Sequence, residues 1–252
     1  MPISAVLLDI GGTLWPDRWP SREADDAARL ERLRATLPLL SDDRARDLLA
    51  ELNAGALTLD RELQQNWRMP MREALRRLDL PADAAAIRAL RSAMCLPARG
   101  RIDLFPGARG LLAAINGLGL ACVVISNAVW RDTQAYQRDF ADLGVADRID
   151  AVVSSVDAGY RKPHPIIFHQ ALHKARCEPR AAVMIGNSEA KDIEPALALG
   201  MQTIRVAIEE PLPARSAAHA VAGSLDQVAT TLRAWGRASR HDTLSVHEWE
   251  RR

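Results

Sequence analysis

The chain has 252 residues, 48% of them hydrophobic and 26% charged, which is enough to bury one core and a smaller second domain. Its formal net charge of +1 argues against a surface for nucleic acid or an anionic membrane. No apolar run approaches the roughly 20 residues that a membrane span needs, and the N-terminus lacks a signal-peptide pattern, so we expect a cytoplasmic protein without a membrane partner.

An apolar run over residues 3–8 predicts a buried strand that ends at Asp9. Open α/β sheets bind ligands at the carboxyl ends of their strands, so the Asp9 carboxylate is a candidate nucleophile. Gly11 and Gly12 allow a sharp turn close to a ligand, and Thr13 adds a hydroxyl to the same loop. Taken alone, this stretch could equally be a polar strand end before a Gly-Gly turn.

The stretch from residue 15 to residue 101 is rich in Arg, Leu and Ala, and prolines divide it. Its apolar residues have helical spacing in four segments, residues 25–37, 42–52, 71–80 and 83–94. These segments predict a helical domain. Four residues near its beginning either line the entrance to a site or pack the hinge: Trp15, Arg18, Trp19 and Arg22.

From residue 102 onward, short apolar runs alternate with helical segments, as in a parallel sheet covered by helices. The predicted strands are residues 121–125, 149–155, 181–185 and 201–207, of which the last closes the sheet. The predicted helices are residues 108–116, 132–143, 165–176, 193–199 and 224–235. The expected domains are a core of residues 1–14 and 102–235, a helical cap of residues 15–101, and a mobile polar tail of residues 236–252.

Polar residues follow three of the later strands. Ser126 and Asn127 come after the second strand, Lys162 lies in a polar segment after the third, and Asn187 and Asp192 come after the fourth. Because the carboxyl ends of parallel strands share one edge of a sheet, we expect these residues to meet the carboxylate that follows the first strand. Lys162 is one of only three lysines among 33 basic residues. A lysine in a chain that otherwise uses arginine indicates that a compact positive charge is required at this position.

The polar segments after the first four predicted strands resemble the motifs of the haloacid dehalogenase superfamily. Phe105-Pro106-Gly107 also resembles a family motif, and the resemblance covers roughly residues 3–207. That family has a nucleophilic Asp in Asp-x-Asp-Gly-Thr, a Ser or Thr after the second core strand, a Lys before Pro, and an acidic Gly-Asp-x-x-x-x-Asp segment. The resemblance implies an α/β fold: a Rossmann-like parallel sheet core with helices on both faces and an inserted α-helical cap domain. The family includes many phosphatases.

By this resemblance, Asp9 would attack the substrate, while Lys162 would hold Asp9 and offset charge on the transferred group. The substrate's anionic oxygens would be bound by Ser126, Asn127, Gly12 and Thr13. A magnesium ion would be held by oxygen atoms of Asp9, Gly11, Asn187 and Asp192, together with waters.

Two positions depart from the family pattern. Gly11 stands where the family's phosphatases carry a second Asp as general acid, and such an acid contributes roughly 10²–10⁴ in rate. Asn187 stands where the fourth motif usually begins with Asp, so a cation meets less negative charge. We therefore expect weakly bound magnesium and substrates whose leaving group needs no protonation.

Several of these residues have simpler interpretations. Ser126-Asn127 could cap the following helix, and Asp192 could cap a helix that begins at residue 193. Glu189 and Lys191 are typical of a solvated helix start. His164, between two prolines, is typical of a structural residue, and the odd number of scattered cysteines is typical of reduced thiols.

Three functions fit the sequence. The leading one is a magnesium-dependent phosphatase that acts on a small phosphorylated metabolite through an aspartyl-enzyme intermediate. The second is a metal-independent hydrolase resembling the haloacid dehalogenases, although that branch usually has an aromatic residue at the position of Gly11. The third is a non-catalytic protein that binds a phosphorylated ligand or a partner, which the intact Asp9 and Lys162 argue against. No motif identifies the substrate or the oligomeric state.

Overall fold

The computed structural model describes residues 2–17, 22–61 and 68–236, so Arg18, Trp19 and the expected tail beyond residue 236 lie outside the described residues. Six parallel strands form one sheet in the order β3-β2-β1-β4-β5-β6. The strands are β1 (Ala5–Leu8), β2 (Ala121–Ser126), β3 (Ala151–Ser154), β4 (Ala182–Gly186), β5 (Gln202–Val206) and β6 (Ala220–Ala222). The fold class predicted from the sequence is confirmed.

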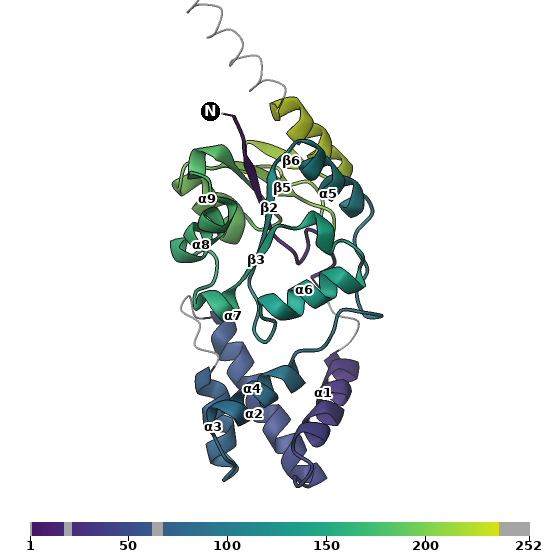
Figure 1. Cartoon of the computed structure of the whole chain (residues 1–252), viewed down its shortest axis with the longest axis vertical. Helices are drawn as coiled ribbons and strands as arrows, with labels where there is room; N and C mark the ends of the chain where they lie inside the picture. Colours follow the sequence, from purple (N-terminus) through teal and green to yellow (C-terminus); the bar gives the residue numbers. More distant parts are fainter. Residues whose placement is uncertain (1, 18–21, 62–67, 237–252) are drawn as a thin grey trace, which may run out of the picture.

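Helices cover both faces of the sheet, which explains why the strands are almost continuously apolar. In β1, Val6 and Leu8 join one hydrophobic cluster and Leu7 joins another on the opposite face. The first face is covered by α5 (Ala108–Gly117), α6 (Thr133–Asp142) and a helix over residues 225–236. The second is covered by α8 (Pro165–Ala175) and α9 (Glu194–Ala198), on the other side of the strands in Figure 1.

The strand order reverses direction at β1. The chain proceeds from β1 outward through β2 to β3, and then crosses to β4 on the other side of β1. In open α/β sheets, the crevice beside such a reversal is where ligands bind. The loops that follow β1, β2 and β4 therefore meet at the position expected for a ligand site.

Four helices are inserted between β1 and α5, and Figure 1 shows them grouped at one end of the molecule, beyond the sheet. They are α1 (Arg22–Thr36), α2 (Asp42–Arg61), α3 (Arg68–Arg77) and α4 (Ala84–Met94). Their apolar faces form a separate hydrophobic cluster, to which the core contributes the buried residues Trp130 and Val156. Within the described residues, no helix is both long and apolar enough to span a bilayer.

Some elements differ from those predicted. The strand over residues 202–206 does not close the sheet, because β6 pairs with its outer edge. Ala220-Val221-Ala222 is too short to give a periodic signal, which is why the sequence did not reveal it. Helix α2 extends to Arg61, past the predicted end at residue 52, and α7 (Ser155–Ala158) adds a short turn after β3. The three cysteines are unpaired, as predicted.

Candidate active site

Asp9 lies at the carboxyl end of β1, in a loop that holds its carboxylate in place. Its backbone N–H donates to the Ile185 carbonyl of β4 at 2.9 Å. The chain then turns sharply: the N–H of Thr13 donates to the Ile10 carbonyl at 3.0 Å, and Gly12 has a φ of 68°, a conformation that favours glycine. The Thr13 hydroxyl donates to Oδ2 of Asp9 at 3.2 Å. Thr13 thus orients the carboxylate.

Lys162 contacts residues at the carboxyl ends of three strands, β1, β2 and β4. Its ammonium Nζ donates to Oδ1 of Asp9 at 2.5 Å, to Oδ1 of Asp192 at 2.7 Å, and to the Ile125 carbonyl at 3.3 Å. Burial alone would lower the pKa of this lysine, but the carboxylates of Asp192 and Asp9 outweigh burial and raise the pKa above its ordinary value. Lys162 therefore stays positively charged beside the candidate nucleophile.

Asp192 is the second buried carboxylate of the site, with 1% of its surface exposed. Burial raises its pKa to about 6, opposed by the Lys162 ammonium and by the Ser188 N–H, which donates to Oδ2 at 3.0 Å. The suggestion that Asp192 caps a helix is wrong, because Ser188 caps this turn by accepting from the Lys191 N–H. The carboxylate is thus directed into the site.

The residues after β2 have different tasks. The hydroxyls of Ser126 and Tyr136 share a hydrogen bond of 2.8 Å. The Asn127 amide donates to the Lys162 carbonyl at 2.9 Å and accepts from the Lys162 N–H at 2.8 Å, so its side chain fixes the lysine loop. Neither residue caps α6, whose N-cap is Asp132. The sequence analysis missed Tyr136, for which it offers no motif.

Two side chains lie directly against the glycines of the Asp9 loop. A Cβ added to Gly12 would lie 2.2 Å from Nδ2 of Asn187, so this position has no room for a side chain. A Cβ added to Gly11 would lie 2.5 Å from Oδ1 of Asp17. Asn187 therefore faces the loop, as its place in the sequence predicted, whereas Asp17 belongs to no recognised motif and was missed.

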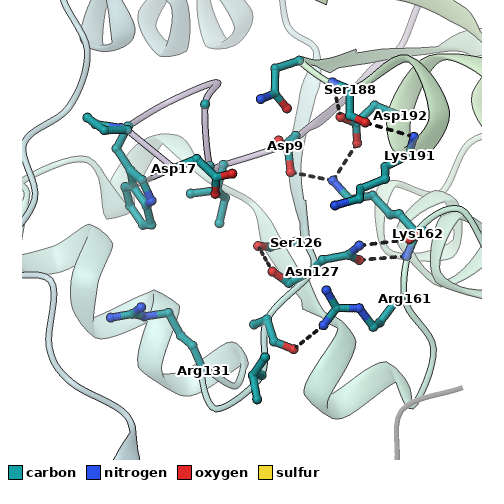
Figure 2. Close-up of a pocket in the computed structure, with 18 of the residues that line it drawn as sticks. Asp9, Asp17, Ser126, Asn127, Arg131, Arg161, Lys162, Ser188, Lys191 and Asp192 are labelled. Carbon is teal, nitrogen blue, oxygen red and sulfur yellow. Dashed lines mark hydrogen bonds and ion pairs between the residues drawn. The ribbon is translucent and has the colours of Figure 1, made fainter. Parts of the chain in front are cut away.

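These residues line a cavity of about 1050 Å³ between the core and the inserted helices. Asp9, Lys162 and Asp192 are almost fully buried and lie together in Figure 2, while Arg131 and Arg161 flank them on the side of Ser126. The inserted helices contribute further lining residues, among them Arg29 and Asn53. Such a half-open cavity with charges of both signs fits a small polar substrate.

The polar donors in this cavity favour a hard cation. The carboxylates of Asp9 and Asp192 and the Lys162 ammonium together leave one net negative charge, which by itself repels an anionic substrate. Oxygen atoms from these carboxylates, the Gly11 carbonyl and the Asn187 amide are ligands that magnesium accepts. Among the described residues, no group of three or more His, Cys, Asp or Glu side chains could hold a metal. A magnesium ion here would therefore be held by the two carboxylates together with neutral oxygen atoms and water.

Other predicted residues have structural roles. Trp15 is buried and packs on the rings of Tyr136 and Phe140, with centroids 6.2 and 5.6 Å away, and it also lines the cavity. His164 caps α8 by accepting from the Ile166 N–H at 3.3 Å. The expectation that Glu189 is solvated is wrong, because it accepts from Arg205, Ser216 and the Ala217 N–H.

The model of the haloacid dehalogenase-like hydrolase family matches residues 3–200. The chain belongs to this family. Within it, the chain is 30% identical to ribulose-1,5-bisphosphate 5-phosphatase of Halopiger xanaduensis, over 80% of this chain and 83% of that protein. It is 37% identical to haloacid dehalogenase-like hydrolase domain-containing protein 3 of Bos taurus over 44% of this chain, but that match spans only 42% of the bovine protein.

Among solved structures, a 2-haloacid dehalogenase of Pseudomonas syringae pv. Tomato superposes with a TM-score of 0.63 at 21% identity, covering 92% of this chain and 99% of that one. This likeness supports the family fold. It does not distinguish a phosphatase from a dehalogenase, since the sequence identity is low.

Proposed function

We propose that this hydrolase is a magnesium-dependent phosphatase for a small phosphorylated metabolite and that Asp9 becomes phosphorylated during turnover. The observation that carries the proposal is the buried contact between Asp9 and Lys162 in a cavity shared by the core and the inserted helices. A carboxylate held by a fixed cation is suited to attack phosphorus, because phosphoryl transfer depends mainly on positioning and charge stabilisation. The Halopiger relative, named a phosphatase, supports the same chemistry.

In the first step, an Asp9 oxygen bonds to phosphorus and the bond from phosphorus to the leaving group breaks. In the second step, water bonds to phosphorus and the bond to Asp9 breaks, which releases phosphate and restores the carboxylate. Lys162 offsets the negative charge near Asp9 in both steps. The Ser126 hydroxyl, oriented by Tyr136, and the backbone at Asn127, Gly12 and Thr13 bind the phosphoryl oxygens.

Oxygen atoms of Asp9, Gly11, Asn187 and Asp192 would hold the magnesium ion. When bound, the ion supplies positive charge that neutralises the phosphoryl oxygens. Because only two of these four proposed ligands, Asp9 and Asp192, are carboxylates, we propose that magnesium binds weakly. A cytoplasmic location and the division into a core of residues 1–14 and 102–235 and a cap of residues 15–101 are part of the same proposal.

The test is a panel of phosphate esters, acyl phosphates and 2-haloacids, each assayed with magnesium and with a chelator. We expect hydrolysis of phosphorylated compounds only, and only with magnesium. Asp9→Asn should abolish it, and Asp142→Asn, a change at an exposed residue of α6, should not. Release of halide in the presence of chelator would instead establish the dehalogenase-like function.

A further inference from the structure

Asp17 places a carboxylate where residue 11 has no side chain. Its Oδ1 lies 2.5 Å from the position of a Cβ on Gly11, which is about the reach of an aspartate carboxyl from its own Cβ. Asp17 is exposed and lines the cavity, and Figure 2 shows it in the same pocket as Asp9, with its carboxylate turned toward that residue. An acidic group therefore stands beside Asp9 although residue 11 cannot supply one.

The proposed reaction needs such a group. When the bond between phosphorus and the oxygen of an alkyl group breaks, that leaving oxygen is strongly basic and must receive a proton. Two of the other carboxylates that line the cavity are held in ion pairs, Asp192 with Lys162 and Glu189 with Arg205. Asp17 is set apart from these by its place against the loop that carries the nucleophile.

We propose that Asp17 is a catalytic residue, the general acid and base of this hydrolase, an inference that rests on the proposed phosphatase function. In the first step, the Asp17 carboxyl gives its proton to the leaving-group oxygen as the bond from that oxygen to phosphorus breaks. In the second step, the Asp17 carboxylate takes a proton from the water that bonds to phosphorus. Asp17 is thereby restored as a carboxyl and Asp9 as a carboxylate.

Gly11 alone would restrict the enzyme to substrates whose leaving group needs no protonation. The proposed role of Asp17 removes that restriction. With Asp17 in place, the enzyme hydrolyses alkyl phosphates as well as phosphates with weakly basic leaving groups. The same contact gives Gly11 a reason to lack a side chain, since any Cβ there would displace the Asp17 carboxylate.

The test compares an alkyl phosphate with nitrophenyl phosphate as substrates of the purified full-length protein. Asp17→Asn should lower kcat/KM for the alkyl phosphate by roughly 10²–10⁴, because it removes the proton donor. The kcat/KM for nitrophenyl phosphate, whose leaving group needs little protonation, should change less than about tenfold, because kcat/KM reports the first step and not the later attack of water. Glu210→Gln, the same carboxyl-to-amide change at another exposed residue of the cavity, should affect neither rate.

A selective loss on the alkyl ester cannot come from general misfolding. In the double variant Asp17→Ala with Gly11→Asp, a carboxyl returns to the vacated place, and at least part of the alkyl phosphate activity should return with it. The inference is overturned if Asp17→Asn lowers kcat/KM for both substrates equally, or if the native protein hydrolyses only nitrophenyl phosphate. Either result leaves the phosphatase function standing, whereas a native protein inactive on both esters would remove the proposed function and this inference together.

Discussion

Replacing Lys162 by methionine should destabilise the protein as well as inactivate it. The ammonium lies between two carboxylates, with Nζ–Oδ1 distances of 2.5 Å to Asp9 and 2.7 Å to Asp192. Methionine fills a similar volume but leaves both carboxylates buried without a cation. Removing one partner of a buried ion pair typically costs about 3–5 kcal/mol, so we expect a loss of that order in the free energy of unfolding at pH 8.

The loss should depend on pH. Without Lys162, two neighbouring buried carboxylates cannot both stay charged, and one takes up a proton more readily than it does in the unfolded chain. The folded variant then binds more protons than the unfolded one, so its stability falls as pH rises. The stability difference from the native protein should therefore be smaller at pH 5 than at pH 8.

Urea unfolding at the two pH values measures this difference. Lys191→Met, which removes an exposed lysine from the same cavity, is the matched control and should change the free energy of unfolding by no more than about 0.5 kcal/mol. A free energy of unfolding of Lys162→Met within about 1 kcal/mol of the native value at pH 8 would correspond to roughly the contribution of an exposed ion pair. That result would contradict a strong contribution from the buried ion pairs of Lys162.

Three further changes test other parts of the site. Asn187→Asp should tighten magnesium binding about tenfold in calorimetric titration, if the added charge contributes on the order of 1.4 kcal/mol. The pKa of Asp192 is about 6 in the folded protein against an ordinary 3.8, so the folded state binds more protons in this range. The native protein should thus lose up to about 3 kcal/mol relative to Asp192→Asn as pH rises from 4 to 7, measured by urea unfolding without metal. Tyr136→Phe removes the hydrogen bond to Ser126 and should weaken inhibition by inorganic phosphate by up to about tenfold, with a fold unchanged in circular dichroism.

The sequence predicted the central geometry of the site because that geometry follows from strand topology. Asp9, Lys162 and Asp192 each follow a predicted strand, and parallel strands bring their carboxyl ends to one edge. The structure brings these three side chains into direct contact. Their catalytic and metal-binding roles stay predictions.

The sequence could not predict contacts that depend on packing between distant elements. Tyr136 reaches Ser126 only because α6 packs on the sheet next to β3, and nothing in its spacing indicates that contact. Asp17 approaches Gly11 because the chain bends back after Trp15, whose ring is buried against α6. Local periodicity reports which face of an element is apolar, but it does not report where a loop returns.

The most direct test of the central claim is to locate the phosphoryl group on the enzyme during turnover. The protein is mixed with a phosphorylated substrate that the panel has identified, quenched in acid at a series of short times, digested, and analysed by mass spectrometry. We predict one added phosphoryl group on Asp9, which forms and decays at rates consistent with kcat. A phosphoryl group on a different residue, or full turnover while Asp9 stays unmodified at every quench time, would contradict the proposed mechanism.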